Sequence, residues 1–220
     1  TNVALGSSAF GNNSFSSTGG NNIAVGNASM YSSAAITGAD NIGIGRDTFR
    51  NLTSGANNVG IGLEALNKVT SGSGNAAVGS TALKNNTASN NTAFGGDALT
   101  ANTTGSANTA VGSAALTSMV SGGNNTAVGY YAGLIATGGD TTAIGANALG
   151  IATTGSGNTV IGSYAGSSLT SGAGNICIGA SANTTSATSD NQIAIGSSTY
   201  YVGTTGGANG YATSANILST

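Results

Sequence analysis

Short apolar segments recur along the chain at a nearly constant interval, and each ends in glycine. The shared pattern is Asn-x-Ala-(Val/Ile)-Gly, and its twelve copies end at Gly6, Gly26, Gly45, Gly62, Gly79, Gly95, Gly112, Gly129, Gly145, Gly162, Gly179 and Gly196. From Gly45 onward the spacing is 16 or 17 residues. A fixed period of this length is typical of solenoids, in which equivalent coils stack on one another. The pattern predicts an all-β fold, a parallel β-solenoid of about twelve coils of 16–20 residues over residues 1–200, with a cap or linker over residues 201–220.

The three residues before each glycine alternate in size, as in a short strand. Counting the motif glycine as position 0, position −1 is always apolar and usually branched, position −2 is mostly small, and position −3 is Val, Ile, Ala or Thr. We expect the larger side chains at −1 and −3 to fill the coil interior. The small side chain at −2 would then face outwards and leave room for a neighbouring chain. The glycine ends the strand and permits a tight corner.

Two further columns complete the predicted coil. Asn occupies position −4 in ten copies, with Thr141 and Gln192 as the exceptions. Stacked amides can bond to each other and to turn backbone, so we expect this column to be structural. A second inward anchor is predicted at position +4 for Leu66, Leu83, Leu99, Leu116 and Leu149. The single cysteine, Cys177, lies at position −2 and is expected to be a small apolar filler.

Composition narrows the classes of partner. Only 5% of residues are charged, the net charge is −2, and His, Pro and Trp are absent. Such a chain offers no basic surface for nucleic acid or an anionic membrane. The chain contains no run of about 20 apolar residues, so the sequence predicts no membrane insertion. Because the chain opens inside a repeat, we expect it to be a piece of a longer protein.

A coil of this size encloses very little apolar side chain, and much of it is alanine. Ordering the backbone of one residue costs about 1–2 kcal/mol, whereas burying one Val, Ile or Leu contributes about 1.5–3 kcal/mol. Two or three apolar anchors per coil do not offset the ordering of a whole coil. The sequence therefore predicts that copies of the chain associate around their long axis.

Particular repeats resemble known fibre proteins. Residues 125–132 read Asn-Thr-Ala-Val-Gly-Tyr-Tyr-Ala, and Thr153, Thr154 and Gly155 form a Thr-Thr-Gly loop. In these features the chain resembles bacteriophage tail-fibre repeats. Residues 141–148 are similar to the shorter head repeats of trimeric autotransporter adhesins. The resemblance implies a homotrimer that acts as a rigid spacer in host attachment, located outside the cell on a virion appendage or a cell surface. A bacterial adhesin head is the alternative that it leaves open.

Two carboxylates are the candidates for catalysis. Asp47 and Glu64 share position +2 in neighbouring coils, and paired carboxylates can hydrolyse glycosidic bonds. Nearby cations favour a solvated charged face instead: Arg46, Arg50 and Lys68. A polysaccharide depolymerase would need a pocket, yet no insertion surrounds the pair. We expect no enzyme activity, no cofactor and no metal site.

Tyrosine pairs are the candidates for ligand contact. Tyr130 and Tyr131 are adjacent, as are Tyr200 and Tyr201. Exposed tyrosines can stack on sugars, which would make a cell-surface glycan a partner. The other interpretation is a contact between chains, or a cap.

A threonine column suggests a different function. Five consecutive coils carry Thr at position −3, namely Thr92, Thr109, Thr126, Thr142 and Thr159. Flat threonine ladders on small solenoids can bind ice, so ice binding is an alternative function. Position −3 has the parity of the apolar position −1, however, so we expect these side chains to face the interior or a neighbouring chain.

Overall fold

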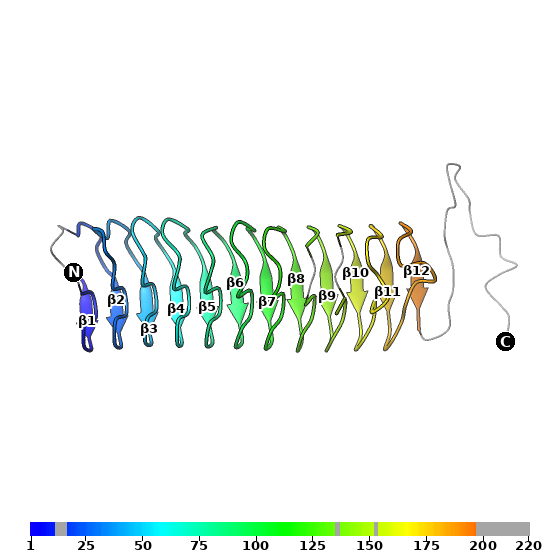
Figure 1. The fold of residues 1–220 in the computed structure, drawn as a ribbon, viewed down its shortest axis with the longest axis horizontal. Coiled ribbons are helices and arrows are strands. Elements are labelled where there is room, and N and C mark those ends of the chain that lie inside the picture. The colour runs from blue at the N-terminus through cyan, green and yellow to red at the C-terminus, as the bar shows by residue number, and fades with distance from the viewer. Residues whose placement is uncertain (12–16, 135–136, 152–153, 197–220) are drawn as a thin grey trace, which may run out of the picture.

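In the part of the chain that the structure describes, twelve three-residue strands form one parallel sheet whose order follows the chain (Figure 1). The structure is a computed structural model, and it describes residues 1–11, 17–134, 137–151 and 154–196. The strands are β1 (Val3–Leu5), β2 (Ile23–Val25), β3 (Ile42–Ile44), β4 (Val59–Ile61), β5 (Ala76–Val78), β6 (Thr92–Phe94), β7 (Thr109–Val111), β8 (Thr126–Val128), β9 (Thr142–Ile144), β10 (Thr159–Ile161), β11 (Ile176–Ile178) and β12 (Ile193–Ile195). The predicted parallel β-solenoid is confirmed, with about 11 turns of ~17 residues. The described part of the chain has no helix long and apolar enough to cross a membrane.

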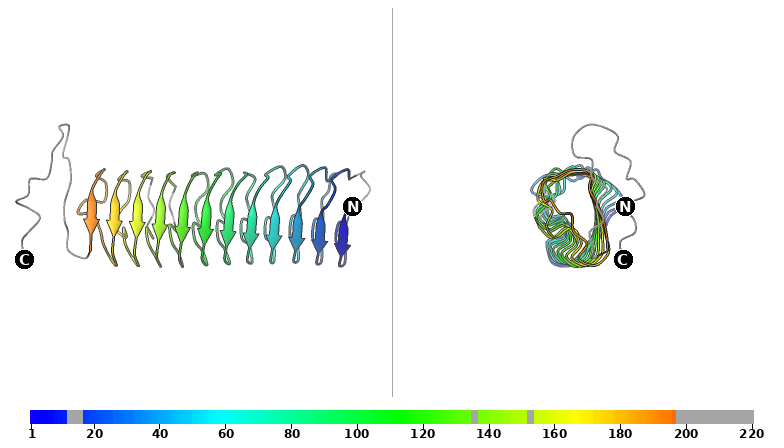
Figure 2. Two further views of the ribbon diagram at one scale, coloured as in Figure 1. Left: turned by 180° about the vertical axis from the view of Figure 1, so that it is seen from behind. Right: turned by 90° about the vertical axis from the view of Figure 1, so that its right-hand side faces the viewer.

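Every strand pairs with the next in the register of the repeat. Thr109 is opposite Thr126, and Val111 is opposite Val128. Viewed along the rod, the coils nearly superimpose (Figure 2). Residues at the same repeat position therefore form columns that run the length of the solenoid. The predicted cap or linker at residues 201–220 lies outside the described residues.

The predicted orientation of the strands is wrong. From β2 onward the small side chain at −2 is buried, as at Ala110 and Ala127, whereas −1 is exposed or partly exposed. The thin interior explains the reversal. A Cβ added at Gly60, a −2 residue, would lie 2.9 Å from the Phe49 ring. Because the coil is already filled from its opposite side, only a small side chain fits at −2.

The opposite side of the interior is formed by two columns. The predicted anchors at +4, Leu66, Leu83, Leu99, Leu116 and Leu149, are all buried, as expected. A second column at position +7 was not predicted, and its apolar members are Leu52, Val69, Met119 and Leu169. Cys177 is also buried, as expected of an apolar filler. The core is thus a narrow stack of alanines packed against leucines.

The predicted asparagine ladder is confirmed. Asn58 Nδ2 donates to Asn41 Oδ1 at 3.0 Å and to the Gly72 carbonyl at 2.9 Å. The Asn58 backbone N–H also donates to Asn41 Oδ1. Such an amide joins one coil to the next and pairs a buried corner carbonyl, although Asn175 Nδ2 is buried without a hydrogen-bond partner. At the exception Thr141, the backbone N–H still donates to Asn125 Oδ1.

The corner after each strand depends on glycine. The motif glycines from Gly6 to Gly179 have φ between 120° and 141°. A Cβ on Gly112 would lie 2.5 Å from the carbonyl oxygen of Gly129 in the next coil. Glycine is therefore needed both for the backbone angle and for the close approach of stacked coils.

Candidate functional site

The outer side of the sheet is an uncharged surface along the whole solenoid. We call the −1 and −3 side chains of β1–β12 the sheet face. At −1 the exposed side chains are Leu5, Ile44, Ile61, Phe94, Val111, Val128, Ile144, Ile161, Ile178 and Ile195. Most of these are 36–39% exposed, and no position of the sheet face carries a charge. Contiguous exposed apolar patches are typical of interaction surfaces, so this stripe is the candidate for one.

The threonine column lies on this same surface. Thr92, Thr109, Thr126, Thr142 and Thr159 pair in register from β6 to β10 and are partly exposed. Of the two expected orientations, the one toward the interior is wrong, because the buried side of the strand is at −2, and the one toward a neighbouring chain stays a prediction. In this part of the sheet face, threonine therefore alternates with a branched or aromatic apolar residue on every strand. Neighbouring threonines are separated by the strand spacing of about 4.8 Å.

The candidate catalytic carboxylates lie on a polar corner formed by positions +1, +2 and +5. Asp47 accepts a hydrogen bond from Arg50 Nη1 at 2.5 Å. Glu64 pairs with Lys84, with 2.8 Å between Oε2 and Nζ. The two carboxylates thus occupy neighbouring coils but are bound to different cations, which is the arrangement of a charged, solvated corner.

The same corner carries tyrosines farther along the solenoid. The ring centroids of Tyr130 and Tyr131 are 4.3 Å apart, at an interplanar angle of 70°. A hydrogen bond with the Tyr131 side chain raises the pKa of Tyr130. Tyr164, two coils on, is as exposed as Tyr130 and was missed because it stands alone in the sequence. The other predicted contacts, Tyr200 and Tyr201, lie outside the described residues.

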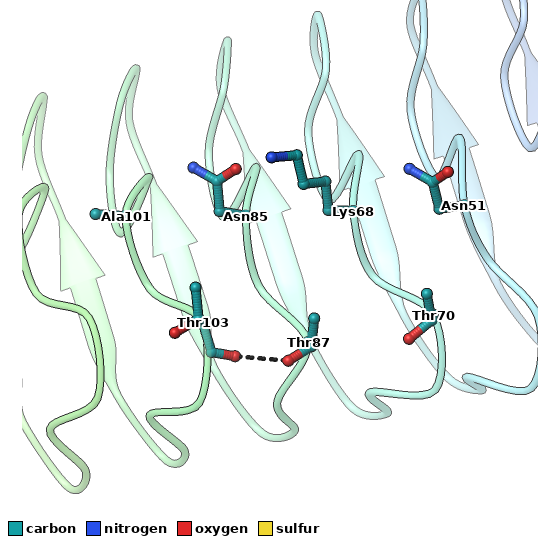
Figure 3. Close-up of a pocket in the computed structure, with 7 residues that line it drawn as sticks. All are labelled: Asn51, Lys68, Thr70, Asn85, Thr87, Ala101 and Thr103. Atoms are coloured by element: carbon teal, nitrogen blue, oxygen red, sulfur yellow. Dashed lines mark hydrogen bonds between the residues drawn. The ribbon is translucent and has the colours of Figure 1, made fainter.

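An open groove of about 570 Å³ crosses four consecutive coils away from the strands (Figure 3). It is lined by Asn51, Lys68, Thr70, Asn85, Thr87, Ala101 and Thr103. The Thr87 hydroxyl donates to the Thr103 carbonyl at 2.8 Å, and Asn85 Nδ2 donates to the Thr100 carbonyl. Many of the polar groups in the groove therefore stabilise the stack itself.

Two further features bear on chemistry. Burial raises the pKa of the Cys177 thiol, which favours the protonated form that suits a packing role. Within the described ranges, no group of three or more His, Cys, Asp or Glu side chains could hold a metal ion. The candidate functional surfaces of the described residues are therefore the sheet face and the polar corner.

Comparison of the chain with protein-family models, with curated proteins and with solved structures found no match. The functional argument therefore rests on the surfaces of the solenoid itself.

Proposed function

We propose that the chain is a structural segment of a trimeric surface fibre, with a viral tail fibre as the leading assignment. Three copies pack side by side through their sheet faces, and the assembled rod acts as a rigid spacer in host attachment. The observation that carries this proposal is the uncharged stripe of branched aliphatic side chains along β1–β12. Its length matches that of the solenoid, as an interface between parallel copies requires.

The burial energy available at the sheet face supports association. Covering the exposed third of a branched aliphatic side chain contributes roughly 0.5–1 kcal/mol. Summed over the −1 column this reaches on the order of 10 kcal/mol per chain, which is comparable with the cost of association, about 4–15 kcal/mol. The −3 column adds to the gain. Self-association through this face is thus energetically reasonable without any salt bridge.

The number of copies comes from the resemblance rather than from this energy. Tail-fibre repeats and adhesin-head repeats, which residues 125–132 and 141–148 resemble, imply homotrimers outside the cell. A bacterial adhesin head built in the same way is the alternative within this proposal.

Charge placed on the sheet face tests the proposal. We expect sedimentation velocity to give about 62 kDa for the native chain, three times the 20.7 kDa of one copy. Replacing Val128 and Ile144 by Lys would put charge into the proposed interface, so the double variant is expected to sediment as a monomer. The matched control places lysines on exposed Ser106 and Ser118, which lie outside the sheet face, and should remain trimeric. A native monomer, or a trimer that survives V128K/I144K, would contradict the proposal.

Ice binding is the second candidate, and the threonine column favours it. Partly exposed Thr109, Thr126 and Thr142 stand in register on a long parallel sheet. Because a face covered by other copies is not available to ice, the two functions exclude each other. A monomeric native chain that shows thermal hysteresis, lost in T126K, would replace the fibre proposal. A trimer without hysteresis would remove ice binding.

A further inference from the structure

The only two arginines of the chain line a single pocket near the N-terminal end of the solenoid. The pocket has a volume of about 340 Å³. It lies at the polar corner and spans the three coils that contain β1, β2 and β3. We call it the arginine pocket, and its lining residues are Ser8, Asn27, Ala28, Tyr31, Arg46, Asp47 and Arg50. Its size is at the lower end of the range for small-molecule sites, about 300–1,000 Å³.

Arg50 is held in place by two contacts. Its Nη1 lies 2.5 Å from Asp47 Oδ1, and its guanidinium carbon lies 5.6 Å from the centroid of the Tyr31 ring. A guanidinium over a ring face at this distance is a cation–π contact. Arg50 therefore contributes a fixed positive charge and orders the tyrosine wall of the pocket.

Arg46 differs from Arg50 because its guanidinium makes no close contact with Asp47. Its Nε is 3.9 Å from Asp47 Oδ2, too far for a hydrogen bond, and its side chain is 63% exposed. Its planar guanidinium can therefore present paired N–H donors to a ligand. This fork matches the geometry of a carboxylate.

The charge of the pocket selects the ligand. Arg46, Arg50 and Asp47 sum to one positive charge, which a single carboxylate neutralises. A phosphate monoester carries about −1.5 to −2 at neutral pH and would be left with excess negative charge. Tyr31 is partly exposed and offers a sugar the part of its ring that Arg50 does not cover, while Asn27 and Ser8 are exposed groups that can bond to hydroxyls.

We infer that the arginine pocket binds one carboxylate-bearing sugar unit of an acidic glycan. The carboxylate lies on the Arg46 guanidinium, the sugar ring lies beside Tyr31, and the Asp47–Arg50 pair holds the wall in position. This inference goes beyond the spacer function, because it gives the rod a glycan contact of its own away from the sheet face.

Arginine side-chain NMR gives a direct test on the full chain, since it contains only two arginine Nε–H signals. The probe is trigalacturonate, titrated at low ionic strength. We expect a saturable shift of the Arg46 signal, assigned from its loss in R46Q. Isothermal titration calorimetry should show trigalacturonate binding at least about tenfold weaker to R46Q, because a charge-assisted contact is removed.

Three controls define the outcomes. K84Q removes a cation from the same corner but outside the pocket, and should bind trigalacturonate as the native chain does. Maltotriose, which lacks carboxylates, and sodium acetate, which lacks a sugar, should each bind more weakly than trigalacturonate. No Arg46 shift, an equal loss of binding in K84Q, or equal binding of acetate would each overturn the inference. None of these readouts depends on whether the chain is a trimer.

Discussion

At the scale of single residues, the fold depends on groups that satisfy the backbone rather than on large hydrophobic side chains. The asparagine column could be predicted because a polar residue at fixed spacing beside a corner has carbonyls to pair. The left-handed backbone at position +4 could not be predicted, since leucine, as at Leu99, rarely adopts it, whereas aspartate, as at Asp97 in position +2, adopts it more readily. The φ values of Asp97 and Leu99 are 59° and 53°. Bonds between coils, such as that from Leu99 N to the Ala115 carbonyl at 3.0 Å, stabilise this conformation.

Removing one amide from the column should be costly. The Asn108 side chain donates to Asn91 and to the Gly122 carbonyl, and accepts from the backbone and side chain of Asn125. In N108A these buried groups lose their partners, at about 1–3 kcal/mol each. We expect the free energy of unfolding in urea to fall by about 3–6 kcal/mol.

The matched control for this substitution is N51A. Asn51 is exposed and makes one side-chain hydrogen bond, to the Asn67 carbonyl. Its loss should cost less than about 1 kcal/mol. Equal effects of N108A and N51A, at the same protein concentration, would show that the column is not a main source of stability.

At the scale of the coil, alternation in the sequence gives the strands but not the side of each strand that is buried. The pattern of large, small, large predicts a strand with either face inward. The thinness of the coil decides which side is buried, because in most coils a leucine or phenylalanine at +4 already fills the space opposite −2. That information lies in the distance between the two sides of one coil, and no local sequence pattern contains it.

The coil that contains β10 has a larger residue at −2 and a smaller one at +4 than most other coils. Val160 is the one valine at position −2, and its coil has Gly166 instead of leucine at +4. A Cβ on Gly166 would lie 3.0 Å from Val160 Cγ1. Gly166 has φ of 62°, close to the 51° of Leu149 at the same position. The two residues therefore share one space, and leucine would fit the backbone.

A double-mutant cycle tests whether Val160 and Gly166 share this space. G166L alone should overpack the coil and V160A alone should leave a cavity, each costing about 1–3 kcal/mol of unfolding free energy. The double variant rebuilds the usual alanine and leucine pair, so we expect a favourable coupling of at least about 1 kcal/mol. Additive costs in thermal or urea unfolding would refute the shared-volume explanation.

At the scale of the whole molecule, the solenoid separates its surfaces by chemistry. The sheet face is uncharged, whereas ion pairs such as Asp47–Arg50 and Glu64–Lys84 lie on the polar corner. A second apolar contact was predicted from the thin coil and stays a prediction, but the apolar face that we propose for it was not predicted. The side chains at −1 and −3, which were predicted to fill the core, point outward and are therefore available to other copies. The arginine pocket escaped prediction because its residues come from three coils and show no motif in the sequence.

Thiol accessibility tests the central claim most directly, because it reports which face is covered. V128C places a cysteine on the sheet face and S118C places one on an exposed position outside it, while the native Cys177 is buried. In the native assembly we expect Cys reagents such as DTNB to modify the S118C variant rapidly and the V128C variant at least about tenfold more slowly. Equal, rapid modification of both variants would show that the sheet face is open to solvent, and would contradict the trimeric fibre.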